Sequence, residues 1–340
     1  MSTGADTAAM TDAGDAGRLR SALQGDRLAT AVRRGGAVVV LLVVIAVGGL
    51  LFGESFLSTR NLLNIALGSS FLAIIAVGMT FVIISAGIDL SVGSVMALAA
   101  VLTAFGAQRG SLVAIVAPLV VCSLVGMVNG LLIGRARMAP FIVTLASLLF
   151  ARGLAFAVSD NGNITYVIPS GMAVTALGQT RILGIGLPLL IALAVFAVGM
   201  AVLNRTSFGQ AVVAIGGSEE AAAQMGLRVA RVKVVLYTVS GLLSGLAGLL
   251  VAARSSSGLS TIGTGLELEA IAAVVIGGTL LTGGRGSLAG TLAGVMLLGA
   301  IQNLINQVGT LATSWQQVVS GVFLVVVVVA QTALQRRARR

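Results

Sequence analysis

The sequence contains no histidine, a single cysteine and a single lysine. Without histidine, the chain has no imidazole general base and no His-ligated metal site. Cys122 lies alone in an apolar run, which excludes an internal disulfide and a cysteine metal cluster. Lys233 is not preceded by a glycine-rich loop, so there is no Walker A motif, and any ATP must be bound by a partner subunit. We therefore expect no cofactor, no metal and no catalytic residue here.

Charge is also scarce, since only 9% of the residues are charged and 57% are hydrophobic. A soluble domain carries about 25% charged residues, so this chain cannot cover a globule in water. The apolar runs are continuous rather than alternating, which favours helices over strands. The sequence therefore predicts an integral membrane protein surrounded by lipid. The net charge of +10 is better explained by basic cytoplasmic loops than by binding of nucleic acid.

Ten apolar runs are candidate membrane spans, and most have the roughly 17–25 residues that a spanning helix needs. They cover residues 35–53, 62–85, 91–107, 111–134, 140–158, 182–203, 234–253, 268–282, 287–307 and 315–333.

With ten spans and a cytoplasmic N-terminus, most Lys and Arg residues fall on the cytoplasmic side, including the terminal QRRARR. We therefore predict that both termini are cytoplasmic. We expect residues 1–34 to form a disordered cytoplasmic tail, residues 35–333 to form the transmembrane domain with a long cytoplasmic loop at 204–233, and residues 334–340 to form a basic cytoplasmic tail.

An internal repeat is suggested by GIDL at 87–90 and GLEL at 265–268, since the apolar runs after each follow in the same order. Five spans per half is an odd number, so the halves must have opposite orientation, as in many transporters. The predicted fold is an all-α membrane protein with about ten transmembrane helices in two inverted five-helix repeats.

Each of the two repeated segments, GIDL and GLEL, contains a glycine and a carboxylate and lies beside a short apolar run. Asp89 precedes the run 91–107, where we expect it to cap the free N–H groups of the helix, with Gly87 and Gly93 allowing a tight turn. Gly265 and Glu267 occupy the matching place in the second half. The alternative for Asp89 is an ion-coupling or proton-relay carboxylate, which the absence of histidine disfavours.

The inner loop 204–233 contains a short helix with its own start and stop. Ser218 is a good N-cap, acidic residues suit the first turn, and Gly226 suits the end. Such a short helix is marginal alone, so its small, alanine-rich face is expected to dock in the groove of a partner. The residues concerned are Ser218, Glu219, Glu220, Ala221, Ala222, Ala223 and Gly226. The alternative is an ordinary amphipathic connector.

Two further groups of residues have several interpretations. Amide side chains within spans either line a substrate pathway or join helices to one another; they are Asn64, Asn129, Gln302, Asn303 and Asn306. Glycines at helical spacing indicate close helix crossings first and a dimer contact second; they are Gly126, Gly130, Gly134, Gly241, Gly245, Gly248, Gly290 and Gly294.

Three stretches together carry a family resemblance. They are SAGIDLSVGSVMALAAV at 85–101, EEAAAQMGLRVARVKVVLYTVSGLLSGLAGLL at 219–250, and GLELEAIAAVVIGGTLLTGGRGSLAGTLAGVMLLGAIQNL at 265–304. Over about residues 37–333 the chain resembles the permease subunit of bacterial ABC importers for simple sugars, the ribose-transporter permease family.

The resemblance implies a bacterial inner-membrane permease that imports a ribose-like sugar by alternating access. It implies three partners: a second permease chain, identical or different, a cytoplasmic ATPase with two nucleotide-binding domains, and an extracytoplasmic sugar-binding protein. Segment 220–226 is similar to the helix that docks on the ATPase, although Ser218 stands where the family often has Asn. The outer loops 54–61, 159–181 and 254–266 are candidate docking surfaces for the binding protein.

Three alternatives remain. The first is an ABC permease for branched-chain amino acids or nucleosides, which has a related architecture. The second is a secondary transporter driven by an ion gradient, which requires an ion-binding cluster within the membrane. The third is a membrane scaffold, which explains neither the repeat nor the docking helix.

Overall fold

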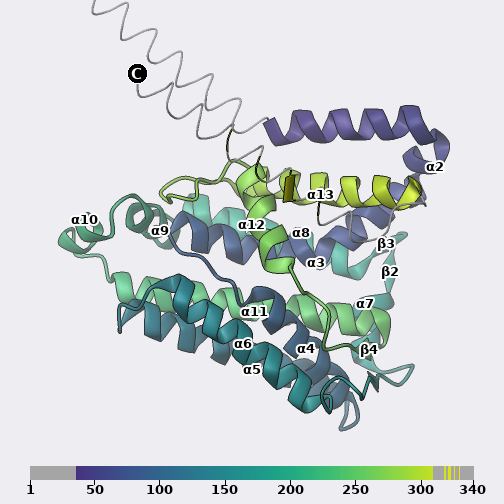
Figure 1. The fold of residues 1–340 in the computed structure, drawn as a ribbon, viewed down its shortest axis with the longest axis horizontal. Helices are drawn as coiled ribbons and strands as arrows, with labels where there is room; N and C mark the ends of the chain where they lie inside the picture. Colours follow the sequence, from purple (N-terminus) through teal and green to yellow (C-terminus); the bar gives the residue numbers. More distant parts are fainter. Residues whose placement is uncertain (1–35, 309–317, 319–320, 323–324, 326–328, 330–340) are drawn as a thin grey trace, which may run out of the picture.

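The computed structural model describes residues 36–308 and the separate positions 318, 321, 322, 325 and 329. Nearly all of this part of the chain is helical (Figure 1). The first helix is Gly36–Phe52. The next helices are α2 (Glu54–Leu57), α3 (Thr59–Ile84), α4 (Val92–Ala107), α5 (Ser111–Gly134), α6 (Pro140–Val158) and α7 (Ala173–Gln179). They are followed by α8 (Leu187–Arg205), α9 (Ser207–Gly217), α10 (Glu219–Gln224), α11 (Val229–Ser255), α12 (Leu266–Ile276) and α13 (Leu288–Val308).

Four very short strands interrupt the helices, although continuous apolar runs favoured helices alone. They are β1 (Tyr166–Val167), β2 (Arg181–Ile182), β3 (Ile185–Gly186) and β4 (Ser257–Gly258). β1 pairs antiparallel with β4, and β2 forms a hairpin with β3. These pairs and α7 lie at one end of the helix bundle, and α10 lies at the opposite end (Figure 1).

Six of the described helices are long and apolar enough to cross a membrane, namely α3, α5, α6, α8, α11 and α13. Three other expected runs form shorter helices, which are Gly36–Phe52, α4 and α12. The last expected run, 315–333, lies almost wholly outside the described residues. A helical membrane protein is therefore confirmed, whereas ten spans and an inverted repeat remain predictions.

The predicted inner loop 204–233 is more helical than expected. It holds α9 as well as α10, and α11 begins at Val229 instead of near residue 234. Thr206 starts α9, because its hydroxyl accepts a hydrogen bond of 3.2 Å from the backbone N–H of Gly209. The segment is thus a chain of three helices joined by short turns, which fixes the position of α10.

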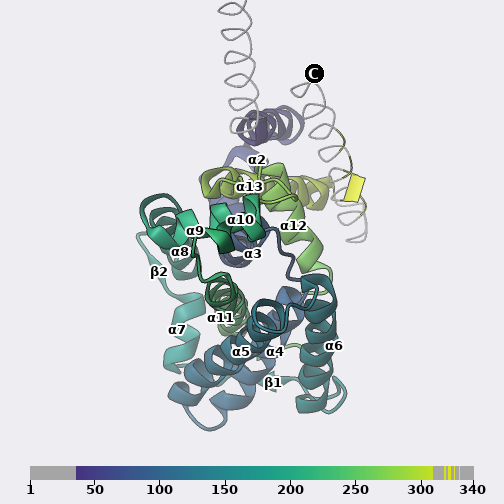
Figure 2. The same cartoon turned by 90° about the vertical axis from the view of Figure 1, so that its left-hand side faces the viewer.

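The core is built around α3 and α11. Almost every residue of the second half of α3 is buried, and α11 packs against α3, α4 and α5. Viewed along the bundle, α3 and α11 lie in the middle, with α8 on one side and α6 and α12 on the other (Figure 2). In contrast, α5 and α6 expose many large apolar side chains, as expected of helices that face lipid or another chain.

Glycines allow the central helices to approach closely. Gly126 and Gly130 of α5 lie directly against the backbone of Tyr237 and Val234 in α11, and Gly241 of α11 lies against the backbone of α5. A Cβ atom at any of these positions would overlap backbone atoms of the neighbouring helix. The predicted close crossings are therefore confirmed. The other predicted glycines also meet neighbouring helices, namely Gly134, Gly245, Gly248, Gly290 and Gly294.

Candidate functional site

The exposed helix α10 begins and ends at the residues that the sequence indicated. The Ser218 hydroxyl accepts a hydrogen bond of 3.2 Å from the backbone N–H of Ala221, which satisfies one free donor of the first turn. Gly226 adopts a left-handed conformation with φ of 83°, and its N–H bonds the carbonyl of Ala223. Glycine takes this conformation without the cost that a side chain adds.

The outward face of α10 differs from the one expected. Ala222 is fully buried within this chain, so it cannot insert into the groove of a partner. Every other residue of α10 is exposed, and so is Met225 after it, with 72% of its surface exposed. A surface for docking must therefore use these residues, while Ala222 holds α10 onto the bundle.

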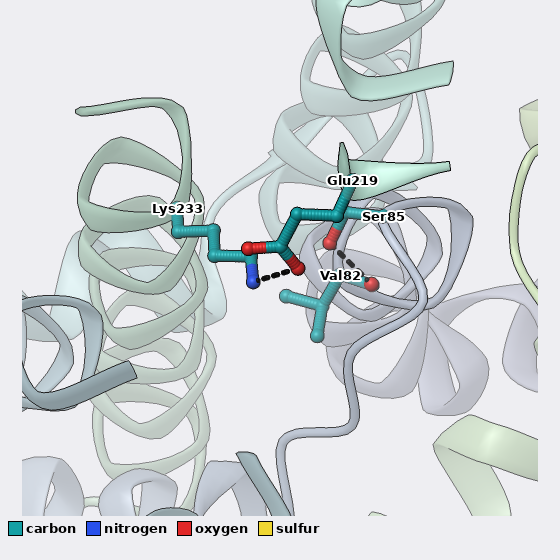
Figure 3. A network of polar contacts seen from close by, with 4 residues as sticks. All are labelled: Val82, Ser85, Glu219 and Lys233. Carbon is teal, nitrogen blue, oxygen red and sulfur yellow. Dashed lines mark hydrogen bonds and ion pairs between the residues drawn. The ribbon is translucent and has the colours of Figure 1, made fainter. Parts of the chain in front are cut away.

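An ion pair joins α10 to the start of α11. Lys233 Nζ lies 2.6 Å from Glu219 Oε2, and the two side chains point toward one another close to Ser85 at the end of α3 (Figure 3). The Lys233 side chain is only 12% exposed, whereas that of Glu219 is 57% exposed. Among the described residues this is the only salt bridge. A largely buried ammonium group needs this carboxylate, so the pair fixes α10 relative to α11.

A cavity of about 310 Å³ adjoins this ion pair. Its lining comes from several helices and the turns between them, including Ser85 and Gly87 after α3, Gly217 at the end of α9, and Tyr237 of α11, with contributions from the end of α5 and the start of α6. The junction between α10, α3 and α11 is therefore not filled by side chains, and small movements of α10 have space there.

One face of α11 connects this junction to the turn between α3 and α4. Lys233, Tyr237 and Ser240 are spaced by four and three residues, which places them on the same side of a helix. The Tyr237 hydroxyl donates a hydrogen bond of 3.4 Å to the carbonyl of Ile88. The Ser240 hydroxyl donates one of 2.7 Å to Asp89 Oδ2. The two ends of this face lie about 10 Å apart at 1.5 Å per residue.

Asp89 is 1% exposed and holds the turn that precedes α4. Its Oδ1 accepts hydrogen bonds from the backbone N–H of Ser91 at 3.0 Å and from the Ser91 hydroxyl at 2.6 Å. We expected the carboxylate to cap the N–H groups within α4. Instead it bonds the residue before that helix, and its second oxygen reaches α11.

The two predicted glycines beside Asp89 lie in tight contacts. A Cβ atom at Gly87 would lie 2.5 Å from the Tyr237 hydroxyl, and one at Gly93 would overlap the carbonyl of Gly263. Gly93 also lies against the carboxylate of Glu267. The start of α4 and the segment 263–267 at the start of α12 therefore meet in space. Gly265, at the start of α12, adopts a left-handed conformation with φ of 81°.

The predicted pathway amides fall into two separate groups. Asn129 is buried, donates to the Ser91 hydroxyl at 3.3 Å and accepts from Ser147 of α6, so its amide joins helices. Asn303 of α13 exchanges hydrogen bonds of 3.1 and 3.0 Å with Asn61 at the start of α3.

Of the remaining predicted amides, Gln302 lies beside Glu269 of α12, and Asn64 and Asn306 are exposed. Among the predicted amides only Asn129 is fully buried, and the other four are at least partly exposed.

Comparison with known proteins places the chain in a family. Residues 61–328 match the family described as the permease component of branched-chain amino acid transport systems. The chain belongs to this permease family.

Curated relatives of this permease are similar over most of their length. It is 40% identical to a ribose import permease protein of Bacillus subtilis over 291 residues, covering 85% of this chain and 88% of the relative. It is 36% identical to an L-arabinose ABC transporter permease protein of Azospirillum brasilense, covering 87% of both chains. It is 34% identical to a fructose import permease protein of Bifidobacterium longum, covering 88% of this chain and 90% of the relative. No solved structure matches the permease.

Several structurally important residues of this permease were missed by reasoning from the sequence. Tyr237 and Ser240 looked like ordinary members of an apolar span, and no local signal pairs them with Asp89, about 150 residues earlier. Arg152 and Glu269 were left without a role. Both could have been singled out from the sequence, because a charged residue inside a membrane span is costly and is rarely without function.

Proposed function

We propose that this chain is the transmembrane permease subunit of an ATP-driven importer for a simple sugar, a monosaccharide such as ribose. The observation that carries the proposal is the similarity along most of the chain to permeases named for ribose, arabinose and fructose import. The helical membrane fold supports it. In this proposal both termini lie in the cytoplasm of a bacterium and the chain resides in the inner membrane.

ATP would be hydrolysed by a separate cytoplasmic ATPase with two nucleotide-binding domains. Its docking site on this chain is α10, which is exposed, firmly capped at both ends and anchored through Ala222. The sequence has no Walker A motif of its own.

An extracytoplasmic sugar-binding protein would dock at the opposite end of the bundle, where α7 and the two strand pairs lie (Figure 1). Antiparallel pairing of β1 with β4 ties loop 159–181 to loop 254–266, which makes one surface of two predicted docking loops. A second permease chain would pack against this one, with the exposed apolar faces of α5 and α6 available for the contact.

The mechanism that we propose is alternating access driven from α10. Closure of the ATPase pair would move α10, and the Glu219–Lys233 ion pair would pass that movement to α11. The hydrogen bonds from Tyr237 and Ser240 would then move the Ile88–Asp89 turn between α3 and α4. The part of α11 from Lys233 to Ser240 thus acts as a rigid lever, with one polar contact near the start of the helix and one in its middle.

A second candidate substrate class is supported by one observation. The family description names branched-chain amino acids, in contrast to the sugars in the names of the relatives. Uptake of both classes should therefore be compared.

The experiment measures uptake of radiolabelled ribose, L-arabinose, fructose and leucine. The cells lack their own importers and express the permease with its ATPase and binding protein. The proposal expects uptake of a sugar, loss of uptake without the ATPase, and co-purification of the ATPase with tagged permease. Uptake of leucine alone would support the second candidate. Uptake that persists without the ATPase and is abolished by an ionophore would establish a gradient-driven transporter.

A further inference from the structure

A row of polar and charged side chains crosses from α6 through the start of α12 to α13. The Arg152 guanidinium of α6 donates hydrogen bonds of 2.6 and 2.9 Å to the carbonyls of Ser260 and Ile262, and it interacts electrostatically with Glu267. Glu269 lies two residues further along α12 and accepts a hydrogen bond of 3.4 Å from Gln302 of α13.

The row lies at a depth where charge is expensive. Arg152 is six residues before Val158, the end of α6, and Gln302 is six residues before Val308, the end of α13. At 1.5 Å per residue, each lies about 9 Å inside its helix. Both helices are candidate spans. A charged group at the centre of the membrane costs roughly 2.5–3.5 kcal/mol on insertion scales, so charged groups within spans normally face the bundle interior or water, pair with one another or with carbonyls, and mark the path of a transported solute.

The side chains of the row are accessible rather than sealed in the core. Arg152, Glu267, Glu269 and Gln302 are all partly exposed, unlike Asp89, which is buried. Within the described residues neither glutamate takes part in a salt bridge. The Arg152 guanidinium therefore offsets part of the charge of Glu267, whereas the Glu269 carboxylate is bonded to the neutral amide of Gln302.

The chemistry of the row suits a sugar. Carboxylates accept hydrogen bonds from hydroxyl groups, a guanidinium donates several in one plane, and an amide does both. A monosaccharide presents neighbouring hydroxyls, each of which donates and accepts. A site built to hydrogen-bond hydroxyls rejects solutes that lack them.

We propose that Arg152, Glu267, Glu269 and Gln302 form a sugar-contacting site within the permeation path, in which the Glu269 carboxylate accepts hydrogen bonds from sugar hydroxyls. This inference rests on the proposed function, and it names the residues that meet the substrate. Glu269 is the key position, because its partner Gln302 is neutral and leaves one carboxylate oxygen available for a ligand.

The test compares Glu269→Gln with the unaltered permease, each reconstituted with its ATPase and binding protein. Two rates are measured: uptake of radiolabelled ribose and ATP hydrolysis stimulated by the loaded binding protein. Losing a hydrogen bond to a charged group should lower ribose uptake about tenfold. ATP hydrolysis should be retained, because α10 and the docking loops are unchanged. As a control, Ser123→Ala removes a hydroxyl that bonds only within α5, and it should leave both rates unchanged.

A swap variant separates contact with sugar from damage to the fold. In the double variant Glu269→Gln with Gln302→Glu, the carboxylate stands on α13 instead of α12. The site therefore keeps one carboxylate and one amide, and most of the uptake lost in the single variant should be restored. Unchanged uptake in Glu269→Gln would overturn the inference, and so would loss of ATP hydrolysis together with uptake or failure of the swap to rescue. If the unaltered permease takes up no ribose, arabinose or fructose, the proposed function fails as well.

Discussion

Ser240 in the middle of α11 donates a hydrogen bond of 2.7 Å to the buried carboxylate of Asp89. The same carboxylate holds Ser91 just before α4. Asp89 therefore joins three elements, since it lies between α3 and α4 and is bonded to α11. A buried carboxylate is tolerated where hydrogen bonds satisfy it, and here its donors are hydroxyl and backbone N–H groups rather than a cation.

Asp89→Asn should preserve substantial transport. The amide oxygen can still accept from Ser91, and the Ser240 hydroxyl can accept from the new NH₂ group because a hydroxyl has both capacities. Asp89→Ala should instead lower stability by about 1–3 kcal/mol, since it leaves buried hydroxyls without their partner. Both variants are tested by thermal unfolding in detergent, which measures stability, and by sugar uptake in cells, which measures transport. Abolished uptake in Asp89→Asn at normal protein levels would favour an ion-coupling role.

Disrupting the Glu219–Lys233 pair should uncouple ATP hydrolysis from transport. Glu219→Gln weakens the link from α10 to α11 but leaves the cap at Ser218 intact, so the ATPase should still bind while uptake per ATP hydrolysed falls. Because Glu219 is largely exposed and the amide oxygen of Gln can still accept a hydrogen bond from the buried Lys233 ammonium, the effect on stability should be below about 1 kcal/mol. The measurement is the ratio of sugar uptake to ATP hydrolysis in proteoliposomes.

The reversed pair serves as the control for this prediction. Glu219→Lys with Lys233→Glu restores an ion pair of opposite orientation and should recover part of the coupling lost in Glu219→Gln. An uptake-to-hydrolysis ratio that stays normal in the single variant would show that α11 is not moved through this contact.

Neighbouring alanines on α10 should respond differently to the same substitution. Ala221→Arg places a large charge on the exposed face and should prevent co-purification of the ATPase while the permease remains stable. Ala222→Arg forces a charge into a fully buried position, so it should lower the amount of folded permease itself. Co-purification and size-exclusion profiles distinguish the two. An ATPase that still binds Ala221→Arg would mean that it docks elsewhere.

The sequence predicted the local features of this protein well. The start and end of helix α10 could be predicted from Ser218 and Gly226, because capping depends only on neighbouring residues and on backbone conformation. Close crossings could be read from glycine spacing for a similar reason, since a small residue on one face allows a second helix to approach. Length and hydropathy located the long helices within a few residues.

Contacts between distant segments could not be predicted in the same way. The orientation of Ala222 depends on how α10 lies on the bundle, and nothing within its six residues determines that. The bond between Ser240 and Asp89 depends on the packing of α11 against α3 and α4. Asn129 illustrates the same limit, because an amide inside a bundle joins helices or meets a solute according to its neighbours, and here its neighbours are Ser91 and Ser147.

Gly241→Ala should destabilise the permease through the crossing of α5 and α11. The added Cβ would overlap the carbonyl of Cys122, which is a backbone atom that cannot rotate away, so the helices must separate. Overpacking of this kind costs about 1–3 kcal/mol. Gly68→Ala on α3 is the matched control, because its added Cβ meets no neighbouring element within 4 Å in the described part of the chain, and it should be neutral or slightly stabilising. Thermal unfolding of both variants decides the matter, since equal melting temperatures would show that α5 and α11 do not cross as closely as described.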